Sequence, residues 1–380
     1  MRTLWLIAGT SLALACSGAT TEKQSLDTSD TSDTSVDTDS PDPITDRCVT
    51  PTADDHLYPP YPDVPDDCIE DFWECPLEPD YATVNPSTFC SITEGFDADG
   101  ALQARFWEAY NYSRDYFGAY GPVYVYFMGP TSEESNSDIW HLRAERRAVP
   151  QACYPVENQV DDFFGNPFGS EELDAANSGD DGYFSISGNS GCNPLMDLMM
   201  INPELDGIRT ITLHEYNHIF QVGHMLTHDR DSDYGLSSWI MEGQATYSAA
   251  RFGDETGWGP DFVDLMMSMK KSGGNVSPEG IDAFLAANRG FDLEAERYWE
   301  NPDYSAAAVY YELGSWAWAY LVHELDDNVD KVLKDFIQDV PVMGREASFQ
   351  LHFDRTMDAF FEEFAVFVQG SDEEWQAILE

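Results

Sequence analysis

The stretch from His214 to His218, His-Glu-Tyr-Asn-His, carries two histidines four residues apart with a glutamate directly after the first. On an α-helix, residues four apart share one face, so both imidazoles can reach a single metal ion. Glu215 is turned by about 100° from His214, which leaves its carboxylate beside the metal rather than on it. There it can take a proton from a zinc-bound water, whose pKa the metal lowers to about 7. The pattern predicts a zinc site with its own general base.

Apolar residues surround the motif on most faces of the predicted helix: Ile208, Ile211, Leu213, Tyr216, Ile219, Phe220 and Val222. Such a helix should be buried. Histidines on a buried helix need partners, because an unpaired buried polar group is costly. A metal ion is one such partner, and hydrogen bonds inside the core are the other.

Two residues compete to be the third protein ligand that a catalytic zinc ion takes. His224 has the spacing of the third histidine in metzincin peptidases, but Gln221 stands where that pattern has the glycine at which the chain turns. Glu242 lies in a second predicted helix, at 239–247, behind a turn-rich loop. We favour Glu242, because His224 would need the first helix to end without its glycine.

The zinc motif together with Trp-Ile-Met-Glu-Gly-Gln-Ala-Thr-Tyr at 239–247 resembles the gluzincin zinc peptidases, which include thermolysin-like and zinc-aminopeptidase-like enzymes. Tyr-Glu-Leu-Gly at 311–314 resembles the Tyr-Glu-Lys-Gly segment of the gluzincin aminopeptidases. The resemblance covers roughly residues 196–370. It implies that the zinc ligands are His214, His218 and Glu242. It also implies that Glu215 is the general base and that Tyr311 donates a hydrogen bond to the oxyanion.

Three features depart from the aminopeptidases. The gap between His218 and Glu242 is longer, Leu313 replaces the lysine, and the Gly-x-Met-Glu-Asn segment that anchors a free amino terminus in that family is missing upstream. The sequence therefore favours an endopeptidase that acts on peptide or protein substrates. Tyr311 can instead be a packing residue, since it follows an alanine-rich run at 306–308. A surface-binding lipoprotein that kept a peptidase fold without catalysis is the alternative of another class.

The first 16 residues resemble a bacterial lipoprotein leader, with an apolar stretch from Leu4 to Ala15 followed by Cys16 as the lipidated residue. The apolar stretch is too short to span a bilayer. Residues 17–47 are rich in Asp, Ser and Thr and have almost no apolar surface to bury, which predicts a solvated tether. We expect an exported protein: an outer-membrane lipoprotein anchored through Cys16, or otherwise a periplasmic or secreted one.

The region 48–195 holds all the cysteines that follow the leader: Cys48, Cys68, Cys75, Cys90, Cys153 and Cys192. An even number in an exported chain predicts up to three disulfides, with their pairing open. The predicted catalytic region, 196–380, contains no cysteine and must rely on its own core.

The chain is strongly acidic, with a net charge of −51 from 70 acidic and 19 basic residues. Nucleic-acid binding is excluded, because neutralising phosphates needs clustered Lys and Arg. Oligomeric state stays open. Alternating carboxylates can converge on a hard cation, so we hypothesise a calcium site in the loop that carries Asp229, Asp231 and Asp233.

The pattern of strands and helices predicts an α+β fold. Strand-like segments at 121–127, 182–187 and 196–201 and an early helix at 101–117 belong to the N-terminal part, and the chain after 205 is almost entirely helical in pattern. We expect a strand-containing N-terminal lobe and a mainly helical C-terminal lobe around a zinc cleft. We further hypothesise that the strand at 196–201 pairs with an extended substrate.

Overall fold

The computed structural model describes residues 88–120, 123–148, 173, 176–179, 183–188, 196–225, 232–272, 280–287, 293–294, 308–325 and 328–379. The predicted leader, the tether and Cys16 lie outside these residues, as does most of the cysteine-containing region. Cys90 is disulfide-bonded, and every other cysteine lies outside the described part of the chain. No helix within the described residues is long and apolar enough to cross a membrane.

Four strands form one sheet in the order β1-β2-β4-β3. They are β1 (Thr88–Ile92), β2 (Val123–Met128), β3 (Tyr183–Gly188) and β4 (Met196–Ile201). The pairs β1–β2 and β2–β4 are parallel, and β3 runs antiparallel to β4. Every residue of β2 is buried, as expected for an inner strand of β-branched and aromatic residues that is covered on both faces.

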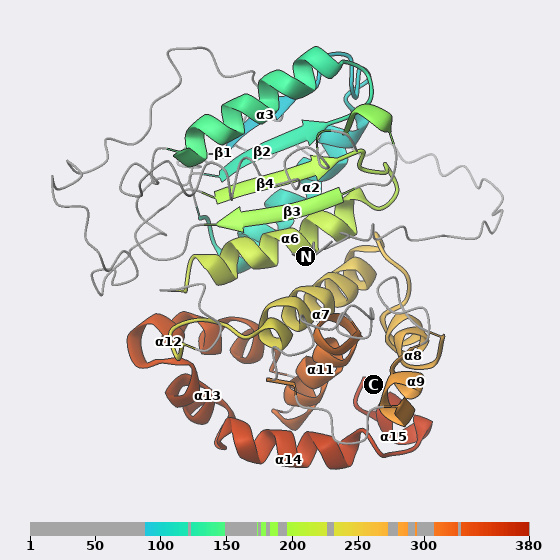
Figure 1. Ribbon diagram of the computed structural model, residues 1–380. Coiled ribbons are helices and arrows are strands. Elements are labelled where there is room, and N and C mark those ends of the chain that lie inside the picture. The colour runs from blue at the N-terminus through green and yellow to red at the C-terminus, as the bar shows by residue number, and fades with distance from the viewer. Residues whose placement is uncertain are drawn as a thin grey trace, which may run out of the picture.

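Helices cover both faces of this sheet (Figure 1). On one face, Val123, Val125 and Phe127 of β2 belong to the main core, together with α2 (Ala101–Phe117) and α6 (Ile208–Val222). On the other face, Tyr124 and Tyr126 pack with Ile139 of α3 (Glu133–Ala148) in a smaller cluster. The alternation of side chains along β2 therefore serves two cores at once.

The hypothesis that the strand at 196–201 binds substrate by strand addition is wrong. This strand, β4, lies between β2 and β3 and uses both of its edges for pairing. An added strand needs a row of unpaired backbone groups, which only an edge strand offers. Within the described residues, β1 and β3 are the edge strands of the sheet.

The described residues after 205 are mainly helical, as the sequence predicts. Its elements after α6 are α7 (Ser238–Thr256), α8 (Phe262–Ser272), α9 (Gly280–Ala287), η5 (Ala308–Leu313), α11 (Gly314–Glu324), η6 (Lys331–Asp335), α12 (Phe336–Met343), α13 (Arg345–Phe353), α14 (Met357–Phe367) and α15 (Asp372–Ala377). Two of them, η5 and η6, are π-helices. The described strands all lie before residue 202, where α2 and α3 also lie, and this mixed, mostly helical fold is consistent with the predicted α+β class.

Helices α6 and α7 pack against each other at the boundary between the sheet and the helical part (Figure 1). Helix α6 also contacts α2 and the edge strand β3. From α7 onward, the helices pack around a core rich in aromatic rings. Four tryptophans in it are fully buried: Trp239, Trp316, Trp318 and Trp375. The predicted zinc motif and the predicted second ligand helix are thus direct neighbours inside the fold.

Candidate metal centre

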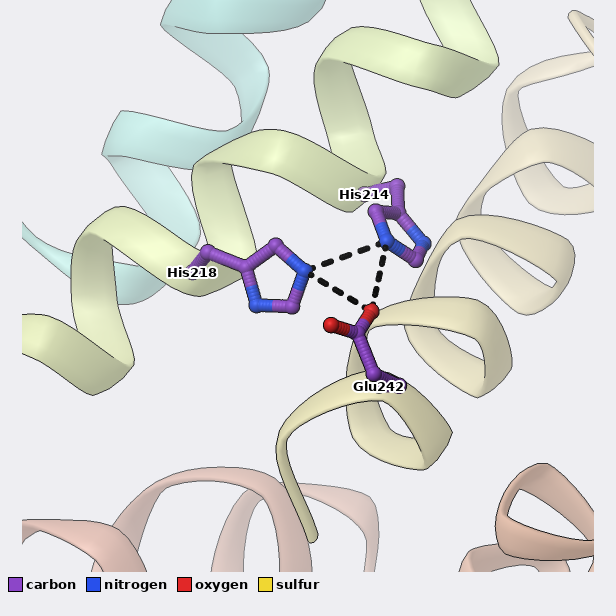
Figure 2. A group of neighbouring side chains, drawn as sticks. All are labelled: His214, His218 and Glu242. Carbon is purple, nitrogen blue, oxygen red and sulfur yellow. Dashed lines mark hydrogen bonds and ion pairs between the residues drawn. The ribbon is translucent and has the colours of Figure 1, made fainter. Parts of the chain in front are cut away.

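His214 and His218 project from the same face of α6, as their spacing predicts (Figure 2). Their Nε2 atoms lie 3.1 Å apart, and the two rings stand nearly perpendicular, at 83°. His218 is buried and His214 is partly buried. The helix therefore presents two imidazole nitrogens to one point.

Glu242, in the first turns of α7, completes the group from the facing helix (Figure 2). Its Oε2 atom lies 3.5 Å from Nε2 of His214 and 3.3 Å from Nε2 of His218. Within the described residues, this buried oxygen has no hydrogen-bond donor besides the two imidazoles. Three donor atoms from two helices thus meet in one place, and they are the one group of this kind in the described part of the chain.

Tyr216 and Asn217, the other two residues between the histidines, form hydrogen bonds from α6 to neighbouring elements. Tyr216 donates a hydrogen bond of 2.6 Å to the carbonyl of Gly118 at the end of α2. Asn217 lies 3.3 Å from Ser248 Oγ of α7, to which its side-chain amide donates. The two residues therefore contact different neighbours of α6, Tyr216 at the end of α2 and Asn217 on α7.

Burial and neighbouring charges shift the pKa values of Glu242, His218 and Glu215. Burial raises the pKa of Glu242, but the neighbouring His218 and His214 outweigh it and leave the value well below the ordinary range. For His218, burial lowers the pKa and the carboxylates of Glu242 and Glu215 raise it, with a net increase. The carboxylate of Glu242 is therefore held ionised, the form in which it binds a metal ion.

Glu215 is buried beside the grouped residues, with 8% of its surface exposed. Burial raises its pKa, while the charges of His214 and His218 act in the opposite direction. It belongs to α6 but is not one of the three converging side chains. This is the placement that one step along the helix predicts for a base beside a metal ion.

Tyr311 reaches the same place from the π-helix η5. Its ring stacks on the imidazole of His214 with the centroids 6.0 Å apart and the planes at 10°. The neighbouring Tyr310 is completely buried, and Tyr247 of α7 is buried with its hydroxyl near Arg251. Of these tyrosines, Tyr311 is the one that the structure brings to the candidate centre.

His224 does not join the group. Its Nε2 atom lies 2.9 Å from the hydroxyl of Tyr120, and its ring packs edge-on against Phe220. Burial lowers the pKa of His224 to about 4, so this partly buried histidine is neutral at pH 7. The geometry gives the metzincin-like alternative no support.

The calcium hypothesis falls mostly outside the described residues, which include Asp233 but neither Asp229 nor Asp231. The carboxylate of Asp233 accepts a hydrogen bond of 2.8 Å from the backbone N–H of Glu346, in the first turn of α13. This contact gives Asp233 a role as a helix cap, because the first N–H groups of a helix have no partner within it.

The sequence pattern did not single out two residues that lie behind the candidate centre. Gln221 stands where the metzincin pattern has a glycine, and its side chain contacts His218, one of the three grouped residues, at 2.8 Å. Gln244 of α7 contacts Gln221 at 2.7 Å. A glutamine three residues after a predicted helical ligand was the available signal, because that spacing makes the two side chains neighbours.

Comparisons of the chain with protein-family models, with curated proteins and with solved structures find no match. The function must therefore be argued from the residues themselves.

Proposed function

We propose that this chain is a zinc-dependent endopeptidase with a gluzincin-like catalytic centre. The observation that carries the proposal is the convergence of His214, His218 and Glu242 from two adjacent helices. The resemblance of the same two helices to the gluzincin motifs supports it independently of the geometry.

The spacing of the three donor atoms fits zinc. A tetrahedral ion with ligand bonds of about 2.0–2.1 Å separates its ligands by about 3.3 Å. The distances among the two Nε2 atoms and Oε2 of Glu242 are 3.1, 3.3 and 3.5 Å. Two imidazoles and one carboxylate are also the ligand set of a catalytic zinc site that keeps its fourth position open.

The surrounding residues supply what peptide hydrolysis needs. Zinc, when bound, supplies a Lewis acid that polarises a carbonyl and acidifies water. The Glu215 carboxylate accepts the proton of the attacking water and passes it to the leaving nitrogen. The Tyr311 hydroxyl donates a hydrogen bond to the oxygen on which negative charge develops. The stacking of Tyr311 on His214 supports this assignment, because it brings the phenol to a ligand of the centre.

An extended substrate would pair with a strand near the centre. The edge strand β3 is the better candidate than β4, because it contacts α6 and has no second partner among the described strands. Backbone pairing of this kind is compatible with many side chains. It therefore suits an endopeptidase that acts within a chain.

We place the enzyme outside the cytoplasm, as an outer-membrane lipoprotein or otherwise as a periplasmic or secreted protein. The leader-like residues 1–16 with Cys16 and the disulfide at Cys90 support export.

The test is cleavage of a diverse peptide library by the chain produced under oxidising conditions, beside the variant Glu215→Gln. The wild type should cut within peptides, and the variant should bind zinc equally but lose nearly all turnover. Equal cleavage by both proteins would remove Glu215 as the base. No cleavage by a folded, zinc-loaded wild type would instead favour a binding protein that kept a peptidase fold.

A further inference from the structure

We infer that Gln221 and Gln244 are positioning residues, which together fix the tautomer of His218 and set the approach of α7 to α6. The inference rests on the metal centre proposed above and concerns the residues behind it. Both glutamine side chains are fully buried, although neither touches the point where the ligands converge.

The two amides form a continuous chain of hydrogen bonds. Gln221 Oε1 lies 2.8 Å from Nδ1 of His218, and Gln221 Nε2 donates to the carbonyl of Met241 at 3.0 Å. The same Nε2 donates to Oε1 of Gln244 at 2.7 Å. Gln244 Nε2 in turn donates to the carbonyl of Leu333, in the π-helix η6, at 3.0 Å.

Two backbone carbonyls determine which group donates and which accepts in each of these hydrogen bonds. The carbonyls of Met241 and Leu333 can only accept, so the nitrogen of each glutamine must face them. Gln221 therefore turns its oxygen toward His218, and that oxygen also can only accept. Consequently Nδ1 of His218 must carry the proton.

This proton placement decides which nitrogen of His218 can bind a metal. A histidine that binds a metal ion is neutral, with one N–H and one lone pair, so a proton on Nδ1 leaves the lone pair on Nε2. Nε2 is the atom that lies 3.3 Å from Oε2 of Glu242. Hydrogen bonds to the far nitrogen of a histidine ligand fix its tautomer and ring orientation.

This series of hydrogen bonds also joins α6 to α7 directly behind the proposed ligands. Gln221 follows His218 by three positions on α6, and Met241 and Gln244 flank Glu242 on α7. A change in the separation of the helices would break bonds of a fully buried amide, which is costly because no water replaces them. The two glutamines therefore resist movements that would separate His218 from Glu242.

The experiment measures zinc affinity by competition with a chromophoric chelator for the full chain and three variants. Gln221→Met keeps the length of the side chain but removes its amide, and should raise the zinc Kd by about 10–100-fold. Gln244→Met leaves the His218 contact in place and should raise the Kd by a smaller factor. Asn217→Ala is the matched control, because it removes a buried contact between α6 and α7 at Ser248 that touches no histidine.

A second readout separates positioning from general loss of stability. In the zinc-loaded wild type, proton NMR should show a slowly exchanging imidazole N–H for Nδ1 of His218, and Gln221→Met should shift it or lose it. The control should keep both this resonance and a Kd within about twofold of the wild type. Circular dichroism and thermal unfolding establish that each variant is folded.

The outcomes divide cleanly. If the wild type binds zinc and Gln221→Met or Gln244→Met changes the Kd no more than Asn217→Ala does, the positioning role is overturned while the proposed function stands. If Gln221→Met does not fold, the zinc Kd of Gln244→Met and the Nδ1 proton resonance of His218 in the wild type test the positioning role. A folded wild type that binds no zinc overturns the proposed function and the inference with it.

Discussion

The backbones of Gly243 and Gly314 are in direct contact where α7 crosses the start of α11. A Cβ atom added to Gly243 would lie 2.5 Å from the carbonyl carbon of Gly314, and one added to Gly314 would lie 3.1 Å from the Cα of Gly243. Gly243 directly follows the candidate ligand Glu242, and Gly314 directly follows the π-helix that carries Tyr311. This contact between two backbones therefore sets the distance from the carboxylate to the phenol.

Gly243→Ala should consequently destabilise the fold and disturb the centre. The new methyl group meets backbone rather than a movable side chain, so the two helices must separate. Overpacking of this kind costs about 1–3 kcal/mol, occasionally more. Urea unfolding measures the stability, and chelator competition measures the loss of zinc affinity.

Gly207→Ala is the matched control for this substitution. Its Cβ would meet the side chain of Ile211 at 3.4 Å, an ordinary contact, just before α6 begins. We expect a change in unfolding free energy within about 0.5 kcal/mol, as for a surface substitution. Equal stability of the Gly243 and Gly207 variants would contradict the role given to the glycine contact.

Glu242→Ala should remove zinc, whereas His224→Ala should retain it. The carboxylate of Glu242 is one of the three converging donors, while His224 is engaged with Tyr120. Metal content after dialysis, measured by atomic emission on folded protein, gives the answer. The opposite result would restore the metzincin-like assignment with His224 as a ligand.

Tyr311→Phe should keep zinc and the fold but lower kcat by about 10²–10³, the effect of losing one oxyanion donor. The ring that stacks on His214 is retained, so only the hydroxyl is removed. Tyr247→Phe serves as the control, because that hydroxyl contacts Arg251 inside α7. Turnover of the Tyr311 variant equal to the wild type would mean that the ring only packs.

The sequence predicted the elements whose apolar pattern is strong. The helix expected at 101–117 is observed at Ala101–Phe117, and the clearest strand signal, at 121–127, corresponds to Val123–Met128. The strands expected from weaker signals at 182–187 and 196–201 are observed within one residue of those bounds. Two elements were missed. Strand β1 is short, with polar Thr88 and Ser91 among its residues, and the large apolar residues of α3 are confined to Ile139, Trp140 and Leu142. Such elements are specified by the neighbours they pack against rather than by their own pattern.

In the candidate site as well, some features follow from the local sequence pattern and others depend on how the elements pack together. The spacing of His214 and His218 follows from helix geometry alone, so the sequence predicted their shared face. The hydrogen bonds of Gln221 depend on how α6 packs on α7, and the position of β4 inside the sheet depends on the pairing order of the strands. Local periodicity carries no information on either, which is why the amide chain was missed and the role of β4 was misjudged.

His224 predicts a pH dependence of stability that is separate from the metal centre. Burial lowers its pKa to about 4 in the folded protein, against an ordinary value of 6.5, and Asp339 offsets this only in part. Between these values the unfolded chain binds a proton that the folded one does not. The free energy of unfolding should therefore fall as the pH drops from about 6.5 and level off below about 4.

The size of this effect follows from the shift in pKa. Each unit corresponds to about 1.4 kcal/mol, and the ring keeps some contact with water, so we expect about 1–3 kcal/mol in total. The measurement is urea unfolding from pH 7 to pH 4 in the presence of a chelator, for the wild type and for His224→Gln, whose amide does not titrate. The difference between the two proteins isolates His224, because His218 and the carboxylates titrate in both. If the two curves of unfolding free energy against pH run parallel, His224 is not held neutral by the fold.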